Sequence, residues 1–233
     1  MEGQSEMSGT KQRNSKHFKR RRRRGSYLGV TGKYPSLKNE HCLFGESFRE
    51  RDLFVACNFD PTVERVDDHP FKINYLDGTK ARHYTPDALL RRSQPGTPPE
   101  IVEVKLAEYL TKDALKFEAA FAAARAYAVT HGMVFRILTE QELPRPKVRN
   151  LRFLFPYRYY KDCPLTETAI RQALVRPMTL GAICKELEAS GLERSRVIDQ
   201  VWRLVSLQQV AVDLDSVLSM GSLLELRAWA ITV

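Results

Sequence analysis

The sequence predicts an α/β fold in which helices flank a mixed sheet, followed by a smaller C-terminal domain. Two observations lead to this prediction. Between residues 44 and 138, a helical stretch, three β-like runs, a second helical stretch and a further β-like run follow in that order. From about residue 161 onward, short helical stretches dominate and two β-like runs come last.

The composition limits the class of protein. The chain has 233 residues, of which 43% are hydrophobic, which is enough for a substantial core. No apolar run reaches the length of a membrane span, and the charged N-terminus shows no signal peptide, so no membrane partner is expected. The four cysteines are scattered and form no CxxC pair. Reduced thiols and a cytoplasmic location are therefore expected.

The net charge of +9 is concentrated at the start of the chain. Residues 1–28 are expected to form a basic flexible tail, and its densest part is Arg20, Arg21, Arg22, Arg23 and Arg24. A block of five arginines does not pack into a core. The tail is read either as a solubilising arm or as an arm that binds DNA phosphates, with nuclear import ranked lower.

Residues 29–145 are predicted to form the first domain. Its first helix runs from Phe44 to Cys57 and is stopped by the following Asn-Phe-Asp-Pro segment. An Asp-Gly pair marks a hairpin turn between the first two strands. The later elements are the strands Phe71–Leu76, Arg82–Leu90 and Glu100–Leu106, the helix Thr111–Thr130, and the strand Met133–Leu138.

Residues 146–160 are expected to be an apolar and basic connector, and residues 161–233 a second domain. Three helices and a hairpin are predicted there, which are the parts of a winged helix. They cover Thr166–Val175, Thr179–Ala189, Ser195–Leu207, Val210–Leu214 and Leu223–Trp229. Arg194, Arg196 and Arg203 belong to the third helix and are expected to face DNA.

The pattern that carries chemistry is Tyr84-Thr85-Pro86-Asp87, followed by Glu103-Val104-Lys105. Side chains alternate along a strand, so Glu103 and Lys105 share a face and Val104 points to the other. The residues around them are apolar, which predicts a buried strand, and a buried Glu and Lys need a reason. Two acids and a lysine suit phosphodiester hydrolysis, and the pattern reads as PD…ExK, typical of a large class of nucleases.

The chemistry predicts a Mg²⁺ site, for which Mn²⁺ can substitute. Asp87 and Glu103 are the expected ligands, the carbonyl of Val104 is another, and Lys105 stabilises developing charge. A third carboxylate is expected from the first helix, where Glu46 and Glu50 are four residues apart and share a face. The histidines show no ligand spacing, so His69 and His83 are read as surface or capping residues.

Six separated segments together resemble the TnsA endonucleases of heteromeric cut-and-paste bacterial transposons. In order, they are Lys33–Lys38, Glu46–Asp52, Asn58–Pro61, Tyr84–Asp87, Glu103–Lys105 and Asn150–Leu154. The resemblance implies a restriction-endonuclease-like domain that cuts the 5′ strands at transposon ends in double-stranded DNA. It also implies a TnsB-like DDE transposase and a TnsC-like AAA+ ATPase as partners, and a bacterial, nucleoid-associated location.

The resemblance also assigns roles to residues. It implies that Glu50, rather than Glu46, is the catalytic glutamate of the first helix, beside Asp87, Glu103 and Lys105. The chain departs from the family pattern at Arg49, where an apolar residue is usual, and at Asp68-His69-Pro70, where an acid-Gln-Pro is common. Two alternatives stay open: a catalytically silent DNA-binding adaptor that recruits an AAA+ ATPase, and a stand-alone phage or defence nuclease.

Overall fold

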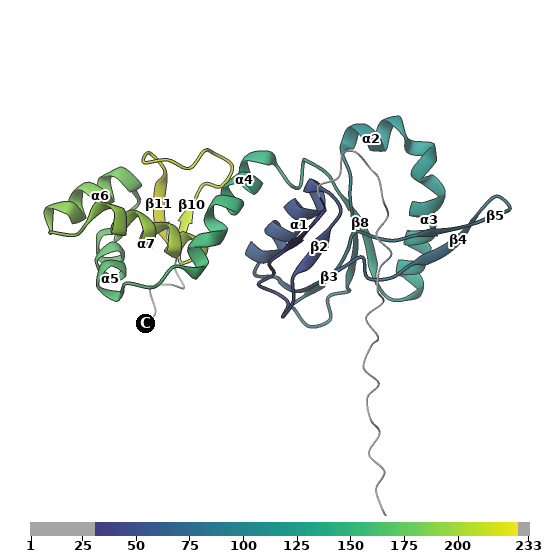
Figure 1. Cartoon of the computed structure of the whole chain (residues 1–233), viewed down its shortest axis with the longest axis horizontal. Helices are drawn as coiled ribbons and strands as arrows, with labels where there is room; N and C mark the ends of the chain where they lie inside the picture. The colour runs from purple at the N-terminus through teal and green to yellow at the C-terminus, as the bar shows by residue number, and fades with distance from the viewer. Residues whose placement is uncertain (1–30, 228–233) are drawn as a thin grey trace, which may run out of the picture.

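The computed structural model describes residues 31–227, so the basic tail with Arg20–Arg24 lies outside the described residues. Figure 1 shows two packed units along the chain, a sheet with its flanking helices and a smaller C-terminal unit. Within residues 31–227, no helix combines the length and the apolar character that crossing a bilayer requires.

A four-stranded mixed sheet is the centre of the first unit, as predicted. Its strand order is β3-β6-β7-β8. The β3–β6 and β6–β7 pairs are antiparallel, and the β7–β8 pair is parallel. This arrangement, flanked by helices, fits a restriction-endonuclease-like fold. The strands are β3 (Val63–Asp68), β6 (Ala88–Arg92), β7 (Glu100–Val104) and β8 (Val134–Leu138).

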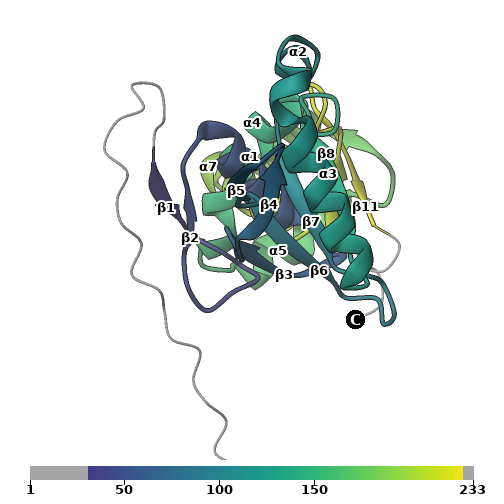
Figure 2. The same ribbon diagram turned by 90° about the vertical axis from the view of Figure 1, so that its right-hand side faces the viewer.

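Helices cover both faces of this sheet. Helix α1 (Phe48–Phe59) packs onto one face, where its apolar residues share a core with Val102 and Val104 of β7. Helix α3 (Ala114–Thr130) lies on the other face, where Ala128 packs against Ile101. It also contacts β4 and β8 (Figure 2). Strand β7 is thus buried from both sides, which explains why its sequence is nearly continuously apolar.

Two short antiparallel pairs complete the unit. Strands β1 (Gly32–Tyr34) and β2 (Leu43–Gly45) pair with each other. Strands β4 (Ile73–Asp77) and β5 (Lys80–Tyr84) form a hairpin that extends away from the sheet in Figure 1. The predicted Asp77-Gly78 turn is confirmed, and Gly78 has φ +60°, a conformation that glycine adopts without strain.

Several predicted boundaries are wrong. The run Arg82–Leu90 is not one strand, because β5 ends at Tyr84 and β6 begins at Ala88. Pro86 lies in the break between them, because proline has no N–H to donate to a neighbouring strand. The helix Thr111–Thr130 is two helices, since α2 (Ala107–Lys112) ends at Asp113 before α3.

The first helix also starts later than predicted. The hydroxyl of Ser47 caps α1 by accepting the N–H of Glu50, so the helix begins at Phe48 and residues before it form β2. Strand β3 was not predicted at all, because its sequence Val-Glu-Arg-Val-Asp-Asp is mostly charged. Its two valines are buried and the remaining residues lie at the edge of the sheet.

The C-terminal unit contains three helices and a three-stranded antiparallel sheet of order β10-β11-β9. The predicted N-cap Thr179 is confirmed, since its hydroxyl accepts the N–H of Ala182. A short strand, β9, was not predicted. The elements are α5 (Pro164–Ala173), β9 (Met178–Thr179), α6 (Leu180–Ala189), α7 (Arg194–Ser206), β10 (Val210–Val212) and β11 (Leu223–Leu226). The part of the last predicted strand beyond residue 227 lies outside the described residues.

The segment expected as a connector is helical. It forms α4 (Arg145–Leu154) and the short 3₁₀ helix η1 (Phe155–Tyr159). Leu151 and Leu154 belong to the same core as Phe59 of α1 and the helices of the C-terminal unit. The Asn150 side chain donates to the carbonyls of Leu214 and Ser216, at 2.8 and 2.6 Å. Helix α4 therefore joins the two units through packing.

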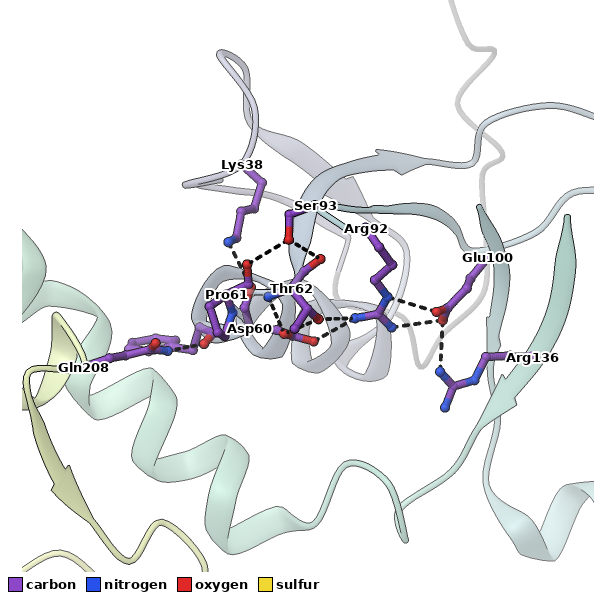
Figure 3. Close-up of polar contacts among 10 residues, drawn as sticks. Lys38, Asp60, Pro61, Thr62, Arg92, Ser93, Glu100, Arg136 and Gln208 are labelled. Carbon is purple, nitrogen blue, oxygen red and sulfur yellow. Dashed lines mark hydrogen bonds and ion pairs between the residues drawn. The ribbon is translucent and has the colours of Figure 1, made fainter. Parts of the chain in front are cut away.

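A network centred on Arg92 holds the end of the sheet opposite the predicted catalytic residues (Figure 3). The guanidinium donates to both oxygens of Glu100, at 2.9 and 3.0 Å, and to Oδ2 of Asp60 at 2.9 Å. Arg136 of β8 donates to Glu100 at 3.0 Å. Gln208 of the C-terminal unit donates to the carbonyl of Phe59. The network thus ties α1, β6, β7 and β8 together beside the second unit.

Replacing Arg92 should destabilise the protein, because Arg92→Ala leaves Glu100 with a partly buried charge. The two side chains are only 16% and 13% exposed. We expect the free energy of unfolding to fall by about 3 kcal/mol in urea titrations. The matched control is Arg82→Ala, whose pair with Asp77 is about half exposed, and here the loss should stay below about 1 kcal/mol. Equal losses in the two variants would contradict this role of the network.

Candidate active site

The predicted catalytic residues come from three separate elements. Glu50 lies in the first turn of α1, Asp87 in the break before β6, and Glu103 in β7 with Lys105 just after it. Glu50 and Glu103 are buried, at 6% and 4% exposure. Asp87 interacts with the charges of Glu50, Glu103 and Lys105, so the structure brings all four residues together.

Lys105 directly follows β7, and its ammonium group forms an ion pair with Glu103, two residues earlier. The hydroxyl of Tyr84 donates to the other oxygen of Glu103 at 2.5 Å. Burial lowers the pKa of Lys105, but the carboxylates of Glu103 and Asp87 outweigh it and raise the pKa above the ordinary value. Lys105 is therefore a fixed cation at neutral pH.

Asp87 is held by backbone groups on both sides. Its Oδ2 accepts the N–H of Val104 at 2.8 Å, and its carbonyl accepts the N–H of His69 at 3.1 Å. Burial and then the charge of Glu103 raise the pKa of Asp87 to about 8. Enclosing this carboxylate beside other acids is unfavourable without an added positive charge.

Glu50 is fixed at the start of α1. Its Oε1 accepts the hydroxyl of Ser47 at 2.9 Å, and its Oε2 accepts the N–H of Glu46 at 2.8 Å. His69 Nε2 lies 3.3 Å from the same Oε2. Burial raises the pKa of Glu50, but the bonds from His69, Glu46 and Ser47 together lower it below the ordinary value. Glu50 is thus poised as a carboxylate, whereas Glu46 is exposed.

His69 is a site residue that the sequence analysis assigned to the surface. Its side chain is 6% exposed and lies between Glu50 and Asp68. Its backbone has φ +43°, a left-handed conformation that is uncommon outside glycine and often occurs at functional sites. The sequence feature that could have indicated His69 is Asp68-His69-Pro70, where the chain departs from the acid-Gln-Pro pattern of the family. Tyr84 was also missed as a site residue, although it belongs to the motif that ends in Asp87.

Three side chains offer a group of ligand atoms for a cation. One ligand atom each from Glu50, His69 and Asp87 lie within 4.8 Å of one another. Glu103 lies outside this group and is engaged by Lys105 and Tyr84 instead. Two carboxylates and an imidazole suit Mg²⁺ or Mn²⁺ completed by water, and the raised pKa of Asp87 indicates that positive charge is lacking there. The residues therefore fit a divalent cation.

The arginines predicted to face DNA from the third helix of the C-terminal unit all have acidic partners. Arg194 pairs with Glu188 at 2.9 Å, and Arg196 lies 3.9 Å from Glu193. The Arg203 side chain is only 17% exposed and bonds Glu167 of α5 and the carbonyl of Tyr160. Arg203 thus packs within the unit, and its role in facing DNA stays a prediction.

Part of the chain matches a known protein family. Residues 60–140 match the family model described as the TnsA-like endonuclease N-terminal domain. This match supports the resemblance of this part of the chain to the TnsA endonuclease family. The TnsA-like match runs from just before β3 to just after β8, and so contains His69, Asp87, Glu103 and Lys105. A search of curated proteins gave no match.

The raised pKa of Asp87 makes the stability of the metal-free protein depend on pH. Between the ordinary value of 3.8 and about 8, the folded state keeps a proton that the unfolded state has lost. The free energy of unfolding should therefore fall as pH rises through this window. The fall should be on the order of 1 kcal/mol per pH unit. Urea titrations in EDTA between pH 5 and pH 8 measure it.

Asp87→Asn should remove most of this pH dependence, because the amide is neutral and its oxygen can still accept the Val104 N–H. Asp77→Asn, at an exposed hairpin position, is the control and should behave like the wild type. An Asp87→Asn protein whose stability still falls as steeply as that of the wild type would contradict the assignment.

Proposed function

We propose that the protein is the metal-dependent endodeoxyribonuclease subunit of a TnsA-like transposase. In this role it cleaves the 5′ strands at transposon ends, so that a partner can complete cut-and-paste transposition. The observation that carries the proposal is the meeting of Glu50 with Asp87, Glu103 and Lys105 beside a TnsA-like match. A helix acid, a strand-end acid and a Glu-x-Lys in one buried site can supply the metal ligands and the cation that phosphodiester hydrolysis uses.

Glu50 and Asp87 would hold Mg²⁺ or Mn²⁺, with His69 as the adjacent nitrogen donor. Glu103 and the carbonyl of Val104 remain proposed ligands. A bound cation supplies a lowered pKa for water and charge neutralisation at the phosphate.

The chain's own groups do the rest of the work. Lys105 stays protonated and is aimed by Glu103, so it can stabilise negative charge that develops on the phosphate. Tyr84 fixes the second oxygen of Glu103 and thereby the direction of the lysine.

The domain organisation belongs to the same proposal. We propose a nuclease domain over residues 29–145, a connecting segment over 146–160 and a winged-helix domain over 161–233. The three helices α5, α6 and α7 with the antiparallel sheet β10-β11-β9 support the winged-helix assignment. A TnsB-like DDE transposase and a TnsC-like AAA+ ATPase are the proposed partners, and the protein would act at the bacterial nucleoid.

Cleavage of a transposon-end duplex with the partner proteins and Mg²⁺ tests the proposal. Asp87→Ala removes a proposed ligand, and Lys105→Ala removes the cation that faces the phosphate. Each should lower the rate of 5′-strand cleavage by roughly 100-fold or more. Glu50→Gln should do the same, because Glu50 is the helix acid that reaches the site.

Glu46→Gln is the matched control for Glu50→Gln, since Glu46 is exposed and lies just before α1. It should cleave like the wild type. Undiminished cleavage by both Asp87→Ala and Lys105→Ala would overturn the site assignment, and a loss with Glu46→Gln but not Glu50→Gln would reverse the choice of helix acid.

A further inference from the structure

A wide groove lies between the start of α1 and helix α4, with a volume of about 1220 Å³. Its lining contains five arginines and only two acids, Asp52 and Glu140. The side chain of Phe48, which is 48% exposed, also lines it. The arginines are Arg49, Arg51, Arg145, Arg149 and Arg152. The groove thus has a strongly positive wall.

Helix α4 supplies three of these arginines from one face. Arg145, Arg149 and Arg152 follow a spacing of four and three residues, which aligns side chains along a helix. Within residues 31–227, Arg145 and Arg149 form no ion pair, and both are exposed. Neighbouring like charges on a helix repel each other, and an anionic ligand would relieve this repulsion.

Positive charge is also in excess where α1 and α4 meet. Arg51 and Arg152 both pair with the single carboxylate of Asp52. Burial and then the charge of Arg51 lower the pKa of Arg152. The Nε atoms of Arg51 and Arg152 are buried without a hydrogen-bond partner in the structure. One carboxylate therefore does not satisfy the two guanidinium groups.

The groove begins beside the candidate active site. Ser47, which lines the groove, donates its hydroxyl to Glu50, and Leu106 of the lining directly follows Lys105. Arg49 and Arg51 flank Glu50 in the sequence. At its other end, Val217 and Leu218 from the loop between β10 and β11 contribute to the lining. A ligand in the groove would therefore extend from the cleavage site toward the C-terminal unit.

We propose that this groove binds the phosphate backbone of duplex DNA and aligns it with the active site. The proposal rests on the proposed nuclease function and adds a substrate-binding surface to it. A polyanion suits a row of arginines better than a single small anion does, because successive phosphates can meet successive guanidinium groups. By contrast, the arginines of α7 are paired with acids and are poorly placed for this task.

Fluorescence anisotropy of a labelled DNA duplex, titrated with the full chain in EDTA over a range of salt concentrations, tests the proposal. The test variant combines Arg145→Gln with Arg149→Gln. Both arginines are exposed, and neither forms an ion pair within residues 31–227. Near 0.1 M salt, affinity should fall by roughly tenfold per arginine, and the slope of log K against log salt should shrink by about 1.8. The basic N-terminal tail is present in every variant, so its contribution is common to the test variant and its control.

The matched control is Arg194→Gln with Arg196→Gln, which removes the same charge from α7 and should change both quantities much less. An unchanged affinity and slope in the groove variant would overturn the proposal and would point to an acidic protein segment as the ligand. An equal loss in the control would also overturn it. Because no metal and no cleavage are involved, this outcome is independent of whether Asp87→Ala abolishes cleavage.

Discussion

The packing of helix α1 on strand β7 determines where the catalytic groups meet. Glu50, Leu53, Phe54 and Cys57 follow helical spacing and form one buried face of α1. The three apolar residues lie in the same core as Val102 and Val104. That core fixes the position of the helix. Glu50, in the first turn of α1, therefore lies at the sheet close to Asp87. Glu46 precedes the helix and stays exposed.

This packing encloses more negative than positive charge. Glu50, Asp87 and Glu103 are countered by Lys105, whose ammonium group is already paired with Glu103. Burial, together with the charges of Glu103 and Glu50, raises the pKa of Asp87. A divalent cation would relieve this imbalance, so the same arrangement that destabilises the metal-free site favours metal binding. The Arg92 network lies at the other end of the same strands, where it links β6 to β7. It stabilises the sheet and so offsets part of the free-energy cost of burying these acids.

Local patterns in the sequence predicted part of this arrangement. Strand alternation predicted that Glu103 and Lys105 lie together, and they form an ion pair although β7 ends at Val104. Helical spacing left Glu46 and Glu50 as the two choices for the third acid. His69 was missed because its position depends on the pairing of β3 with β6, and β3 has too many charged residues to resemble a strand. Helix α4 was read as a connector because Pro144 and Pro146 suggested a boundary, although proline is compatible with a helix start. Arg145, Arg149 and Arg152 form a row only when the segment is helical, so the sequence did not indicate the row.

The most direct measurement of the central claim is anomalous diffraction from crystals grown with Mn²⁺. The account predicts a peak in contact with the carboxylates of Glu50 and Asp87, and its loss in crystals of Asp87→Asn. A peak bound elsewhere, or no peak at Glu50 and Asp87 at saturating Mn²⁺, would contradict the claim that α1 and the sheet build one metal-binding catalytic site.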